Sequence, residues 1–127
     1  MQEKKFVRGS KDNRNLVAMR AYKTENNAVI INLYFGTDLA NRIGLKSGDR
    51  VELYSKRSNR HIVRIKNSHD PATGLKLSYQ GCGAFYNVAY TNRFNTYYKL
   101  KSTTILSFEH IDNETLEIDL SNATIGI

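Results

Sequence analysis

Basic side chains are the residues of this chain whose number and distribution best fit a chemical task, the binding of a polyanion. The 127 residues include 19 Lys and Arg against 12 Asp and Glu, which gives a net charge of +7 and a pI near 9.6. Residues 1–70 hold 15 of these cations and 7 of the acids, whereas residues 71–127 hold 4 and 5. An excess confined to one half favours a phosphate-binding surface; a generally basic surface is the alternative.

Residue types that perform catalysis are present, but they form no catalytic pattern. The histidines His61, His69 and His110 lie far apart in the sequence, and Cys82 lies between two glycines with no basic neighbour to favour its thiolate. The sequence shows no phosphate-binding loop, dinucleotide fingerprint or zinc-ligand spacing. We therefore predict that the protein is not an enzyme and that it binds no metal and no cofactor.

Length and composition are typical of one compact domain. Hydrophobic residues make up 40% and charged residues 24%, as in ordinary globular proteins. No apolar run approaches the 18 residues that a membrane helix needs, and the single cysteine cannot form an internal disulfide. We expect a soluble, cytoplasmic protein with a basic N-terminal arm at residues 1–15 and a single domain at residues 16–127.

The first half of the domain has the alternation that is typical of strands. Val, Ile and Tyr alternate there with polar residues, and turn-forming residues separate the runs. Strands are predicted at residues 16–23, 28–35, 50–55 and 61–66, with a hairpin tip at 56–60.

One short helix is predicted between the second and third of these strands. Thr37 is expected to cap it, and Leu39 and Ile43 form the stripe that it would bury. Gly44 is expected to end the helix in a left-handed conformation, and the run 47–49 is expected to turn the chain into the next strand.

An internal repeat without gaps relates the two halves at an offset of 55 residues. The run Leu45-Lys46-Ser47 falls on Leu100-Lys101-Ser102, and Asn32 falls on Asn87. Apolar positions keep the same register, which predicts a first copy at 16–66, a linker at 67–74 around Pro71, and a second copy at 75–121. The matched apolar pairs include Leu33 with Val88, Val51 with Leu106, Leu53 with Phe108, and Val63 with Ile118.

The run Ile43-Gly44-Leu45-Lys46-Ser47-Gly48-Asp49 joins the predicted helix to the third strand. With the residues from Phe35 to Lys66 around it, this run resembles the AbrB/MazE/MraZ superfamily of swapped-hairpin DNA-binding proteins. That family builds a barrel from two copies of the unit. The resemblance implies a mainly β fold with short helices, a swapped-hairpin AbrB-like barrel, with two pseudo-symmetric copies in one chain.

Some positions depart from the family pattern. Gly36 stands where the family often has proline, and Lys99 takes the place of Gly44 in the second copy. Positions where the family often places arginine hold Asn32, Ala40 and Asn41 here. DNA contacts would therefore depend on other basic residues.

Basic residues with neighbouring asparagines supply the candidate DNA contacts. They come from the end of the first strand with its turn, which faces DNA in the family, from the region of the helix end, and from the hairpin tip. Cations are also common at helix ends and in solvated turns for structural reasons. The predicted nucleic-acid-binding residues are Arg20, Lys23, Asn26, Asn27, Arg42, Lys46, Arg50, Lys56, Arg57, Arg60 and Arg64.

Two functions of different classes fit these observations. The first is a DNA-binding protein, a transcriptional regulator of AbrB-like type that contacts DNA through its basic first half. The alternative is a protein-binding module, antitoxin-like or a virus-encoded inhibitor of a host protein, that uses its acidic, tyrosine-rich second half. We expect no membrane association, and either a monomer with pseudo-twofold symmetry or a homodimer.

Overall fold

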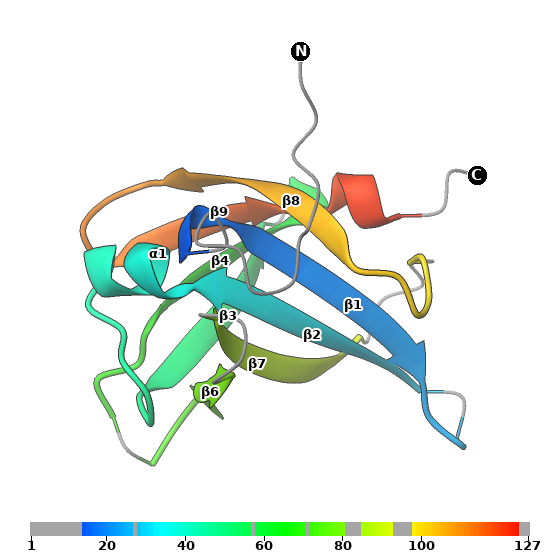
Figure 1. Ribbon diagram of the computed structural model, residues 1–127, viewed down its shortest axis with the longest axis horizontal. Coiled ribbons are helices and arrows are strands. Elements are labelled where there is room, and N and C mark those ends of the chain that lie inside the picture. The colour runs from blue at the N-terminus through cyan, green and yellow to red at the C-terminus, as the bar shows by residue number, and fades with distance from the viewer. Residues whose placement is uncertain are drawn as a thin grey trace.

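The described part of the chain forms a nearly closed, barrel-like β-sheet (Figure 1). A computed structural model describes residues 14–26, 28–56, 58–70, 72–80, 85–92 and 98–124. Across these ranges, nine strands form one sheet in the order β5-β3-β4-β9-β8-β1-β2-β7-β6. All neighbouring strands are antiparallel, and helix is limited to two short elements. The prediction of a mainly β protein with short helices is confirmed.

Two hairpins make up the first half of the sheet. β1 (Val17–Lys23) pairs with β2 (Val29–Gly36), and β3 (Arg50–Lys56) pairs with β4 (Asn59–Asn67). These bounds lie within two residues of the predicted strands. The predicted tip at 56–60 is too long, because Lys56 already pairs with Asn59 after a register shift in the ladder.

The helix α1 (Thr37–Arg42) follows β2 directly. The expected cap is wrong by one residue: Gly36 occupies the N-cap position, Thr37 is already helical, and no side chain caps the helix. Gly44, with φ of 75°, ends it as predicted. The N–H of Gly44 donates to the carbonyl of Asn41 and the N–H of Leu45 to that of Ala40, the bonding pattern of a Schellman motif.

The second half supplies the remaining strands and nearly closes the barrel. The N–H of Leu77 donates to the carbonyl of Asp49 at 2.8 Å, and the Leu77 carbonyl accepts from Gly48 at 3.1 Å. On one side of Leu77 the chain pairs with β3, and on the other side it pairs with β7. Residues 75–80 therefore link the two ends of the strand order. The elements are β5 (Leu75–Lys76), β6 (Ser78–Gln80), β7 (Phe85–Asn92), β8 (Thr104–His110), β9 (Thr115–Asp119) and the 3-10 helix η2 (Ser121–Ala123).

Alternate side chains of the strands fill the barrel interior. In β2, Ile31, Leu33 and Phe35 are buried, whereas Asn32 and Tyr34 between them are only partly covered. α1 adds Leu39 to the same cluster, which continues through both halves of the chain. Because an isolated two-stranded hairpin is marginally stable, this shared core makes each half depend on the other. Members of the cluster from other elements include Val17, Met19, Val51, Val63, Ile65, Val88, Leu106, Leu116 and Ile118.

Chain direction defines two ends of the barrel. β2 runs towards α1 and β3 runs away from it, so the β1–β2 and β3–β4 turns lie at the end opposite α1. Residues 98–101 lie beside the last part of β1, where Leu100 bridges to Ala21. We call the segments 20–26, 56–59 and 98–104 the tip end. We call α1, the loops 43–49 and 67–74, and the β8–β9 turn the helix end.

Candidate nucleic-acid interface

Cations from both halves of the chain meet at the tip end. Arg20 and Lys23 lie on β1, and Figure 1 shows β1 running beside β2 from the side of α1 to the hairpin turn at lower right. Lys56 ends β3, and its exposed side chain lies at the neighbouring turn. Lys99 and Lys101 come from the second half of the chain, on the segment beside Ala21.

Backbone hydrogen bonds fix the segment that carries these two lysines. The N–H of Lys101 donates to the carbonyl of Ala21 at 2.9 Å, and the N–H of Lys99 donates to that of Ala123 at 2.8 Å. Lys101 has φ of 61°, in the left-handed region that L residues rarely adopt. The geometry therefore keeps both exposed lysines next to the end of β1 at the cost of a strained backbone.

The charge balance at the tip end is strongly positive. Its described residues include five cations and a single carboxylate, that of Glu25. None of the five cations forms an ion pair with a residue in the described part of the chain. Exposed cations without carboxylate partners produce the positive potential that attracts phosphates.

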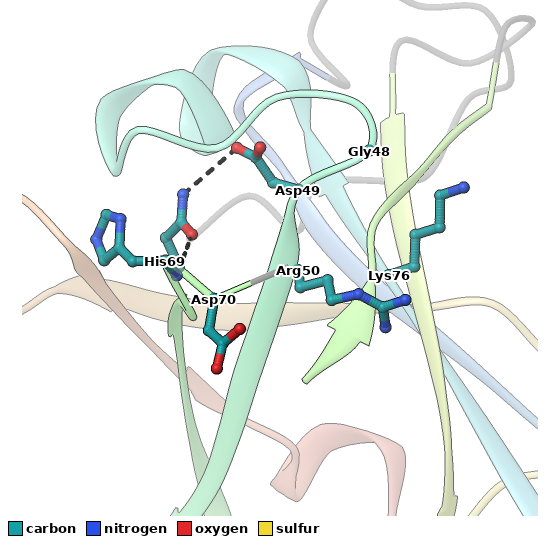
Figure 2. A pocket seen from close by; sticks show the side chains of 7 residues that line it. Gly48, Asp49, Arg50, His69, Asp70 and Lys76 are labelled. Carbon is teal, nitrogen blue, oxygen red and sulfur yellow. Dashed lines mark hydrogen bonds between the residues drawn. The ribbon is translucent and has the colours of Figure 1, made fainter. Parts of the chain in front are cut away.

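The helix end carries both signs of charge around an open cavity of about 470 Å³. Figure 2 shows the acidic side chains of Asp49 and Asp70 beside the basic side chains of Arg50 and Lys76. His69, also in the lining, has Nε2 4.0 Å from a carboxylate oxygen of Glu114. This mixture of charges makes the cavity a poorer candidate for a polyanion than the tip end.

Polar groups in this cavity also stabilise its own loops. Asp49 accepts the backbone N–H of Lys46 at 3.0 Å and the side-chain amide of Asn67 at 3.4 Å. Arg50 donates from Nη1 to the carbonyl of Gly74 at 3.0 Å. These bonds give the side chains of Asp49 and Arg50 a structural role in the turns around the cavity.

Arg64 lies on the barrel wall, away from both ends, and is already paired. Its Nε donates to Glu117 at 2.8 Å, between directly opposite residues of β4 and β9. On the same wall, Lys66 Nζ lies 5.5 Å from the centre of the Tyr54 ring. Tyr54 donates its hydroxyl to Glu52, and this bond raises the pKa of Tyr54. Carboxylates and aromatic rings of the protein thus occupy the cations of this wall.

The structure divides the predicted binding residues among three places. Arg20, Lys23, Asn26 and Lys56 lie together at the tip end, and Arg64 lies on the wall. Asn27 and Arg57 fall outside the described residues, and Arg60 is described only as backbone of β4. The others lie at the helix end, namely Arg42, Lys46 and Arg50.

Sequence reasoning missed Lys99 and Lys101, because it assigned the cationic surface to the first half alone. The 55-residue offset offered a signal, since it aligns Lys101 with Lys46, a residue in the predicted set. The offset relates positions within the two copies, however, and does not show which segments meet in space.

Other kinds of site find little support within the described ranges. No group of three or more His, Cys, Asp or Glu side chains there is placed to hold a metal ion. His61 and His110 lie in β4 and β8, and each has one buried ring nitrogen without a hydrogen-bond partner. Among the helices that are described, none has the length and apolar character to cross a bilayer.

Comparison with known proteins gives no relative for this chain. A scan against protein-family models, a search of curated proteins and a search of solved structures each returned no match. The case for a function therefore depends on the surface of the barrel itself.

Proposed function

We propose that the protein binds DNA through the tip end of its barrel, in keeping with the regulatory role that the AbrB resemblance implies. The observation that carries this proposal is the meeting of Arg20, Lys23, Lys56, Lys99 and Lys101 at one end with Glu25 as the one carboxylate among its described residues. Lysine and arginine bind phosphates mainly through charge, and they release counterions from the DNA as they do so.

The number of cations sets the expected salt dependence. Each phosphate contact to duplex DNA contributes about −0.9 to the slope of log K against log salt, so five contacts give about −4.5. Fluorescence anisotropy with a labelled DNA probe between 50 and 200 mM salt measures this slope. A slope near zero would contradict DNA binding through this end.

Two double variants with the same total charge locate the interface. Lys56→Glu with Lys99→Glu reverses two charges at the tip end, and Lys46→Glu with Lys76→Glu reverses two at the helix end. The first variant should bind DNA more weakly, with a slope shallower by about 1.8, because two phosphate contacts are lost. The second should bind nearly as wild type does. Equal losses in both would indicate attraction by a generally basic surface.

We also propose that the barrel is made of two copies, as the swapped-hairpin resemblance implies. Leu33 and Val88 are 55 residues apart and face each other in the β2–β7 ladder, so exchange of the copies would map this ladder onto itself. The pair Val17–Leu106 has a counterpart in Leu75–Val51, with Leu106 and Val51 again 55 apart. An experimental structure in which residues 16–66 do not superpose on 75–121 would contradict this proposal.

A protein-binding role is the second candidate, and one surface favours it. The β8–β9 turn exposes 42% of Ile111, and the carboxylates of Glu109, Asp112 and Glu114 surround it in the sequence. The backbone N–H of Glu114 bonds to Asp112 and lowers the pKa of that exposed carboxyl. Retention on heparin with elution by moderate salt supports DNA binding. Co-purification of one host protein that persists at high salt after nuclease treatment supports the second candidate.

A further inference from the structure

One wall of the barrel differs in chemistry from the rest of its surface. The strands β1, β2 and β7 lie side by side and contain no Asp or Glu, whereas β3, β4, β8 and β9 carry four. Their inward side chains, such as Ala21, Ile31 and Val88, are buried, so the residues between them face outwards. This carboxylate-free wall continues into the tip end through β1.

An exposed aromatic ring lies on this wall close to the cations. Tyr22 is 38% exposed, and its cross-strand neighbour on β2 is Ile30, which in turn pairs with Thr91 on β7. The adjacent outward row consists of Arg20, Asn32 and Ala89. Thr91 and Ala89 are small and exposed, so low side chains border the Tyr22 ring on the side of β7.

From this arrangement we infer that the ligand is single-stranded nucleic acid, which crosses the outer face of β1, β2 and β7 at the tip end. This inference rests on the proposed function and specifies the form of the nucleic acid. Tyr22 stacks on one unpaired base, while Arg20 and Lys101 bind the flanking phosphates. Strand-binding proteins combine aromatic stacking with a cationic track in this way, and stacking needs a base that is not paired in a duplex.

Tyr54 shows that exposure of a tyrosine is not enough for this role. It is more exposed than Tyr22, at 47%, but it lies on the opposite, carboxylate-bearing wall. Its hydroxyl bonds to Glu52, and Lys66 Nζ already lies 5.5 Å from its ring centre. A base over Tyr54 would have to displace Lys66 and place its phosphates near Glu52. The two tyrosines therefore form a matched pair for an experiment.

The test compares a labelled 12-nucleotide single strand with the duplex of the same sequence, using anisotropy and the full chain. The single strand is expected to bind at least about tenfold more tightly. Tyr22→Ala should weaken single-strand binding about tenfold, within the range measured for loss of one stacked base. Tyr22→Phe keeps the ring and should bind as wild type does, and so should Tyr54→Ala.

Each outcome decides between the readings. Duplex binding as tight as single-strand binding, or equal binding by Tyr22→Ala and wild type, would overturn the inference and leave the proposed function standing. Absence of binding to either probe at 50 mM salt would overturn both. Thermal melting of the variants separates a lost contact from a lost fold, and the phenylalanine variant should melt with wild type.

Discussion

Replacement of Lys101 by glycine should stabilise the protein and weaken its binding of nucleic acid at the same time. Lys101 has φ of 61°, and an L residue in this region costs about 1–2 kcal/mol relative to ordinary backbone conformations. The side chain is exposed, so its removal costs little packing. The N–H that donates to the Ala21 carbonyl at 2.9 Å belongs to the backbone, and glycine retains it.

The expected gain is smaller than the strain that glycine removes. Glycine adds conformational entropy to the unfolded chain, at a cost of about 0.5–1 kcal/mol, which leaves a net gain of about 0.5–1 kcal/mol. For 127 residues the entropy of unfolding is roughly 0.27 kcal/mol/K, so the melting temperature should rise by about 2–4 °C.

Two control variants separate strain from charge. Lys101→Ala removes the ammonium but keeps a Cβ, so it should lose binding without gaining stability. His69 has φ of 58° at the helix end, and His69→Gly should gain stability without losing binding. Circular dichroism melts give the stability, and anisotropy with the single-stranded probe gives the affinity. For Lys101→Gly the salt slope should become shallower by about 0.7, the value for one phosphate contact to a single strand.

The reasoning has two independent points of failure. If Lys101→Gly melts at or below the wild-type temperature, the strain argument is wrong for this residue. If Lys101→Gly and Lys101→Ala both bind as wild type does, the lysine makes no phosphate contact, and the strained backbone has another cause.

Three further predictions concern stability. Gly44→Ala should lower the melting temperature by about 4–8 °C, because its φ of 75° strains an L residue although the space around it is open. Gly74→Ala should cost at least about twice as much, since the new Cβ would lie 2.6 Å from a backbone carbonyl oxygen; equal melting of the two variants would refute this comparison. Arg64→Ala should destabilise by about 1 kcal/mol through loss of the Glu117 pair and leave DNA affinity unchanged, and a loss of affinity would return Arg64 to the interface. Burial raises the pKa of Tyr90 above its usual value near 10, so the folded state holds this proton more tightly than the unfolded state does. Stability should therefore fall as pH rises above about 10, with a shallower fall in Tyr90→Phe; parallel urea-unfolding curves for the two proteins would contradict this.

The strands and turns of the first half were predictable because their signals are local. Alternation placed the four strands within two residues, and Gly44 adopts the left-handed backbone that its place after a helical run requires. The cap was misplaced by one residue, because Thr37 is a common capping residue and nothing in the sequence shows that Gly36 ends the strand and begins the helix.

Pairing between distant strands was less accessible, and with it the surface. Arg64 is a basic residue near a hairpin tip in the sequence, which made it a candidate. Its partner Glu117 lies 53 residues away and becomes its neighbour only when β4 pairs with β9. Lys101 likewise reaches the end of β1 through one bridge at Ala21. A single sequence contains no local signal for either contact.

Charge counted along the chain therefore differs from charge on the barrel. The sequence divides into a basic half and a slightly acidic half, but the sheet order places β8 and β9 between β4 and β1. Each end of the barrel consequently contains segments of both halves. Lysines of the acidic half join the positive tip end, while Arg42, Lys46 and Arg50 of the basic half join the mixed helix end. If the tip end binds nucleic acid, an isolated first half would lack Lys99 and Lys101 as well as the strands that β1 and β4 pair with, so the intact barrel is the smallest unit on which the interface is complete.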